Sequence, residues 1–181
     1  MTARSVELSL IALFTSLAVL FRYAKNLVTM IQFINFPLMF TIIGGMFFGY
    51  KTGCLVGILS YVISDLLIFP GVWTVVNSLL AGFIGFLWGF VGRNRKVGIE
   101  LFAWIYLSIF LFDILSSILL YIVMGLELIN ALVWGFIGLF LPVFGGSLVG
   151  VGPVTEFFTS FLIYTVYREL RKRGVLFEEN V

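Results

Sequence analysis

The sequence predicts an all-α integral membrane protein with six transmembrane helices and both chain ends in the cytoplasm. Of its 181 residues, 61% are hydrophobic and only 11% are charged, and the mean hydropathy is +1.16. A soluble domain carries about 25% charged residues, so these charges are too few to cover a water-soluble surface. Apolar stretches near the length of about 20 residues that crosses a bilayer recur along the chain.

The predicted helices follow from where apolar stretches begin and end along a single domain, residues 1–181. The first stretch lacks a small-residue cleavage site, so we expect it to remain as a helix and not to be removed as a signal peptide. Asn35 is a suitable N-cap for the second stretch, and Pro37 suits a first helical turn. The expected helices cover residues 5–23, 35–49, 53–69, 73–92, 100–124 and 152–170.

Turn-forming and charged residues separate the later helices. Gly49 and Gly53 flank a tight turn before the third helix, and Pro70 followed by glycine ends that helix. Basic residues from Arg93 onward end the fourth helix. The fifth begins at Glu100, and the last ends in a basic segment.

Residues 128–146 are apolar enough for a seventh span, but Pro142 and two following glycines interrupt them. Cytoplasmic segments of membrane proteins carry an excess of Lys and Arg. A seventh span would move the basic segment 168–173 outside, so we expect an outer loop, either re-entrant or lying on the membrane. Six spans place nine basic residues inside, Arg4, Lys51, Arg93, Arg95, Lys96, Arg168, Arg171, Lys172 and Arg173, and two outside, Arg22 and Lys25.

Four polar side chains fall within predicted spans. A carboxylate in the hydrocarbon core costs about 2.5–3.5 kcal/mol on insertion scales, so it usually faces a cavity or a partner. Asp65, Asn77 and Glu156 lie within roughly 6–8 Å of the outer boundary, at 1.5 Å per helical residue. Asp113 lies deeper on the fifth helix. The sequence therefore predicts a polar layer in the outer half of the bundle.

Two tryptophans flank this layer, which favours an outward-facing small-molecule site with aromatic walls and a few polar anchors. The simpler interpretations are a structural hydrogen-bond cluster for the polar residues and interfacial anchoring for the tryptophans. The candidate substrate-binding residues are Asp65, Trp73, Asn77, Asp113, Trp134 and Glu156.

Small residues recur at helical spacing on three predicted helices. Such stripes allow backbones to approach closely, and packing within the bundle explains most of them. Ser9, Ala12 and Ser16 form one face of the first helix near its cytoplasmic end, and this face is the best candidate for docking to a second membrane protein. The other stripes include Gly53 and Gly57 on the third helix, and Gly82, Gly85 and Gly89 on the fourth.

Several functional classes lack their characteristic residues. Histidine is absent and Cys54 is the single cysteine, so we expect neither a disulfide nor a metal site, and no catalytic residue is recognisable. No phosphate-binding loop for ATP hydrolysis occurs. We expect no enzyme activity, no cofactor and no nucleic-acid partner, and we expect the basic C-terminal segment to set topology and contact anionic lipid or a cytoplasmic partner.

Several short motifs stand beside the small-residue face of the first helix: Phe36-Pro37, Phe48-Gly49 with Gly53 and Gly57, and Asn77 with Ala81-Gly82. This pattern resembles the substrate-binding S components of energy-coupling factor (ECF) vitamin transporters. The face containing Ala12 and Ser16 is similar to the alanine-based surface by which these proteins dock, although serine stands in the second place.

The resemblance implies a multi-pass receptor of the cell membrane that binds a vitamin or precursor from outside. It also implies as partners a transmembrane scaffold subunit and two cytoplasmic ATPases. Aromatic walls favour a flat heterocycle, and carboxylates favour an amino-bearing or cationic one. Thiamine or its pyrimidine moiety and riboflavin both stay open as cargo.

Two other classes of function stay open. A stand-alone ion-coupled carrier or channel could use Asp113 and Glu156 as proton or cation sites, although no pair of repeats with interrupted helices is evident. A membrane scaffold protein without a ligand is the other alternative. In that case changing the carboxylates would harm folding alone.

Overall fold

The computed structural model describes residues 3–29, 31–92, 95–141, 143–145, 148–150 and 152–173. This part of the chain forms seven α-helices and three short strands. The helices are α1 (Ala3–Val28), α2 (Phe36–Phe48), α3 (Tyr50–Ile68), α4 (Val72–Val91), α5 (Ile99–Val123), α6 (Leu128–Gly138) and α7 (Gly152–Lys172). The strands are β1 (Ile31–Gln32), β2 (Val143–Gly145) and β3 (Leu148–Gly150).

The all-α class is confirmed, and the observed helices overlap the predicted regions with differences at their ends. An observed helix occupies each of them, and α1 extends five residues beyond the predicted end at residue 23. Asn35 caps α2 as expected, because its side chain accepts a hydrogen bond from the Leu38 backbone N–H at 3.2 Å. The local sequence signal at Asn35 therefore predicts the observed start of α2 correctly.

The segment expected as an outer loop has regular structure. It contains the 11-residue helix α6, and β2 and β3 follow it as an antiparallel pair. β3 also pairs in parallel with β1, so the sheet order is β1-β3-β2. Pro142 and Gly146, whose disruptive effect on a helix supported the loop prediction, lie outside the described residues.

Four of the described helices are long and apolar enough to cross a membrane: residues Arg4–Val28, Tyr50–Ile68, Val72–Val91 and Ile99–Val123. They indicate a membrane protein. The helix α2 has 13 residues, or about 20 Å, whereas the hydrocarbon core is about 30 Å thick. Six spans and their orientation therefore stay predictions.

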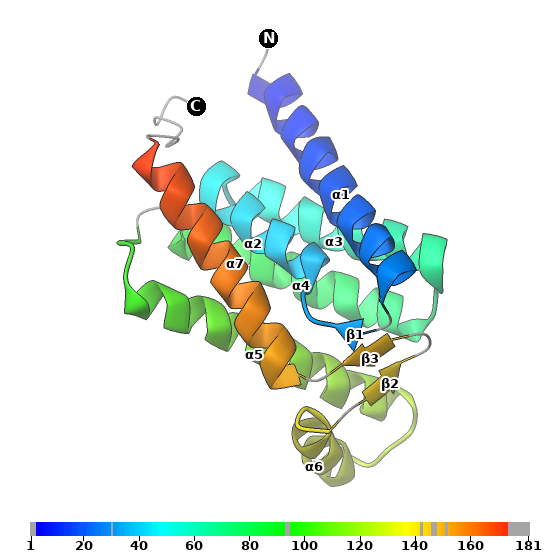
Figure 1. Ribbon diagram of the computed structural model, residues 1–181. Helices are drawn as coiled ribbons and strands as arrows, with labels where there is room; N and C mark the ends of the chain where they lie inside the picture. The colour runs from blue at the N-terminus through cyan, green and yellow to red at the C-terminus, as the bar shows by residue number, and fades with distance from the viewer. Residues whose placement is uncertain are drawn as a thin grey trace.

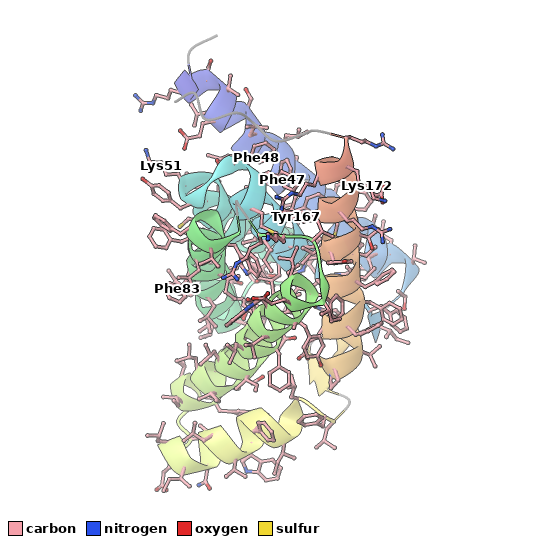
Figure 2. All side chains as sticks on the ribbon, turned by 90° about the vertical axis from the view of Figure 1, so that its left-hand side faces the viewer. Phe47, Phe48, Lys51, Phe83, Tyr167 and Lys172 are labelled. Atoms are coloured by element: carbon pink, nitrogen blue, oxygen red, sulfur yellow. The ribbon has the colours of Figure 1, made fainter. Side chains whose placement is uncertain are left out.

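The first residues of α1 and the last residues of α7 lie at the same end of the bundle, at the top of Figure 1. The strands and α6 lie at the opposite end. Lys51 and Lys172 are in the upper part of Figure 2, where α1 begins, whereas Phe83 lies further down on the outer surface of α4. We call these the termini end and the sheet end of the bundle.

The short helix α2 is the centre of the fold. Ten of its 13 residues are buried, and it packs against α1, α3, α4 and α7. Its side chains supply much of the core, and Phe47 packs on Tyr167 of α7 with ring centroids 5.4 Å apart. A helix that is apolar all round is suited to such a position. Because its neighbours surround it, α2 needs little contact with lipid.

The glycine stripes on α3 and α4 pack against each other, as expected. A Cβ added to Gly57 would lie 2.6 Å from the Ala81 backbone, and one added to Gly85 would collide with the Gly53 carbonyl oxygen. Gly45 of α2 approaches the same place, since its Cβ would lie 2.6 Å from the Gly85 oxygen. Three helices thus meet where only glycine fits.

Candidate functional site

Asn35 connects three helices at the sheet end of the bundle. Its backbone N–H donates to Thr159 Oγ1 of α7 at 2.9 Å, and its side-chain oxygen accepts from the Tyr61 hydroxyl of α3 at 2.9 Å. The parallel pairing of β1 with β3 explains this arrangement, because these strands directly precede α2 and α7 and hold the two helix starts side by side.

Asp65 forms an ion pair with Arg22 of α1. The Nη2–Oδ1 distance is 2.7 Å, and the two side chains are only 2% and 16% exposed, respectively. Arg22 also donates to the Ser64 hydroxyl and lies over the Tyr61 ring, 5.3 Å from its centroid. Arg22, Asn35, Tyr61, Asp65 and Thr159 form a buried network that we call the polar cluster.

Glu156 lies beside this cluster, in the first turns of α7. Its side chain is fully buried at 0% exposure, and neither carboxylate oxygen accepts a hydrogen bond of ordinary geometry from the described residues. The Tyr106 hydroxyl of α5 is close enough to hydrogen-bond to this carboxylate, and Asp113 of α5 is close enough to repel it electrostatically. Asp113 is also close enough to act on Tyr61. Asp113 and Glu156, which we call the acid pair, therefore adjoin the polar cluster.

Asn77 has a separate partner. Its side-chain oxygen accepts a hydrogen bond from the Ser116 hydroxyl, which connects α4 to α5. Ser116 lies one turn from Asp113 on α5, so this contact borders the acid pair.

The two candidate tryptophans lie near the surface. Trp73 stacks on Phe69 with centroids 5.5 Å apart and donates from Nε1 to the Phe69 carbonyl at 3.1 Å. Trp134 is 51% exposed on α6. Helix α6 packs on α5 through Gly135, whose Cβ would meet Ile118. Neither contact joins a tryptophan to the acid pair, and their predicted role in binding stays a prediction.

The predicted layer is thus divided between two connected groups. Asp65 belongs to the polar cluster, and Asp113, Glu156 and Asn77 lie on its α5 side. From the sequence alone, Arg22 is an outer charge and Asn35 is a helix cap, and no sequence signal points to Tyr106. The pairing of Arg22 with Asp65 spans 43 positions, and no local pattern reports such a contact.

The small-residue face of α1 points away from the bundle. Ser9, Ala12 and Ser16 are exposed, whereas Ile11 and Thr15 are buried against the neighbouring helices. The glycine stripes on α3 and α4 differ from this face, because they are buried in the contact between those two helices. The α1 face leaves room for another helix.

Among the described residues, no group of three or more Cys, Asp or Glu side chains is arranged to hold a metal ion. Comparisons of the chain with protein-family models, with curated proteins and with solved structures gave no match.

Proposed function

We propose that this chain is the membrane-embedded substrate-binding component of an ECF-type importer. It captures a water-soluble vitamin or precursor, thiamine-like or riboflavin, from outside the cell. A transmembrane scaffold subunit and two cytoplasmic ATPases supply the energy, since the chain contains no phosphate-binding loop.

The buried carboxylate of Glu156 carries this proposal, because among the described residues it has no cation beside it and only the Tyr106 hydroxyl as a donor within reach. Burying a charged group without a partner is costly, and native proteins rarely leave buried polar atoms without hydrogen bonds. The neighbouring Asp65 has its own cation, so Arg22 does not compensate Glu156. An amino-bearing or cationic heterocycle bound between the acid pair would supply the missing donors.

The location of the acid pair also supports the proposal. It lies at the sheet end, and in the proposed orientation this end faces outward while the termini end faces the cytoplasm. In this orientation α2 and α7 complete the six spans, with α2 surrounded by other helices. The exposed face of α1 with Ser9, Ala12 and Ser16 then provides the surface for the scaffold subunit.

Ligand binding by purified protein tests the proposal. We expect thiamine, its pyrimidine moiety or riboflavin to raise the thermal unfolding temperature. Glu156→Gln should weaken binding of that ligand by about tenfold to a hundredfold, because a hydrogen bond to a charged group contributes about 1.5–3 kcal/mol. Glu127→Gln is the matched control, since Glu127 is an exposed acid at the start of α6.

The proposal fails if none of these compounds stabilises the protein, or if Glu156→Gln and Glu127→Gln bind equally well. The proximity of Asp113 to Glu156 favours one alternative, an ion-coupled carrier, because paired acids on adjacent helices occur along proton pathways. That alternative predicts ion-driven uptake by the chain alone in liposomes. The ECF proposal predicts uptake only with the ATPases present.

A further inference from the structure

A second site lies at the opposite end of the bundle from the acid pair. A cavity of about 380 Å³ opens between α1, α3 and α4, within the range of about 300–1,000 Å³ that small-molecule pockets occupy. Its lining residues are Arg4, Glu7, Leu8, Ile11, Tyr50, Lys51, Cys54, Leu55 and Phe86.

The lining changes from charged to apolar along the helix axes. Arg4 and Lys51 lie in the first turns of α1 and α3, which both begin at the termini end. Leu8, Ile11 and Leu55 lie four to seven residues further along the same helices, or about 6–10 Å deeper at 1.5 Å per residue. Arg4 and Lys51 therefore lie at the end of the cavity nearest the termini, and its apolar part lies further along the bundle.

The backbone at the mouth adds to the positive potential. Helix α3 begins at Gly49, which provides no side-chain cap for the N–H groups of the first turn. The N-terminus of a helix carries a partial positive charge that favours anions. Lys51 lies 5.9 Å from the Tyr50 ring centroid, and neither Arg4 nor Lys51 forms an ion pair with the described residues.

We propose that this cavity binds an anionic phospholipid, with the phosphate between Arg4 and Lys51 and one acyl chain along Leu8, Ile11 and Leu55. The proposal does not depend on the transport function. A lipid has both parts that the lining requires, a negative head and an apolar chain in fixed order. Basic pockets between transmembrane helices bind anionic lipid headgroups in this way. Glu7, the acid in the lining, opposes the phosphate.

Native mass spectrometry of the purified chain with phosphatidylglycerol and phosphatidylcholine of identical acyl chains tests the inference. We expect selective retention of phosphatidylglycerol and no retention of glycerol phosphate, which lacks the acyl chains. Arg4→Gln and Lys51→Gln should each weaken phosphatidylglycerol binding about fivefold, the effect of one basic contact at a membrane surface. Glu7→Gln should strengthen it.

Two further variants separate the cavity from general surface charge. Lys96→Gln removes an exposed cation at the termini end that does not line the cavity, so lipid binding should not change. Leu8→Trp narrows the apolar part of the cavity and should weaken lipid binding. Because the Leu8 side chain is 59% exposed, the substitution should have little effect on folding. Equal retention of the two lipids, or equal losses for Lys51→Gln and Lys96→Gln, would overturn the proposal.

Discussion

At the scale of single residues, two buried acids differ in whether a cation lies beside them. Asp65 and Glu156 are both acids buried in the same half of the bundle, yet only Asp65 has a cation within 2.7 Å. The pair of Arg22 and Asp65 therefore has a structural role that joins α1 to α3. Glu156 has no cation beside it among the described residues, and the Tyr106 hydroxyl is the donor that lies within reach of its carboxylate.

We expect Arg22→Met to lower the free energy of unfolding by about 3–5 kcal/mol, because it leaves the carboxylate of Asp65 buried without its partner. The double substitution Arg22→Met with Asp65→Leu should recover most of this loss, since both charges are then removed. Denaturant unfolding in detergent measures both values. Losses that simply add would contradict the importance of the ion pair.

At the scale of elements, close contact between α2, α3 and α4 fixes the bundle. Gly45, Gly53 and Gly85 meet at one place, and any side chain there would displace a backbone carbonyl. Such contacts replace the hydrophobic effect between helices in a membrane, where lipid is as apolar as the side chains. The glycine spacing predicted this kind of packing on α3 and α4.

Gly85→Val should destabilise the bundle by about 1–3 kcal/mol or more, as expected for overpacking, because the new side chain would meet the Gly53 carbonyl and Thr41. Gly98→Ala is the control: a Cβ there has nothing within 4 Å, and its φ of 179° is extended backbone that any residue adopts. Thermal unfolding of the two variants in detergent makes the comparison. Equal melting temperatures would show that the contact between α3 and α4 contributes little.

At the scale of the whole molecule, the two ends of the bundle differ. The termini end has clustered basic residues, and Tyr167 and Arg171 both donate hydrogen bonds there to the Arg95 carbonyl oxygen. These bonds connect α7 to the segment between α4 and α5. The sheet end contains the polar cluster and the acid pair beneath short paired strands. This asymmetry fits the proposed orientation, in which the sheet end faces outward and the termini end faces the cytoplasm.

Labelling with a membrane-impermeant maleimide tests the orientation of the whole molecule. In a Cys54→Ser background, we expect Glu127→Cys at the sheet end to react in intact cells, because it is exposed between α5 and α6. Lys96→Cys at the termini end should react only after lysis, since the proposed six spans would place it inside. The opposite pattern would invert the topology.

The sequence by itself determined the membrane class, the helical regions and the cap of α2, because composition and helix signals act over a few residues. It also identified Glu156 and Asp113 as costly residues. Only the tertiary structure decided that Arg22 neutralises Asp65 while no cation of the described chain lies beside Glu156, and that α2 is enclosed by other helices. Those outcomes depend on contacts between helices that are far apart in the sequence. The pairing of β1 with β3 and the glycine contacts bring these helices together, and no local sequence pattern predicts such contacts.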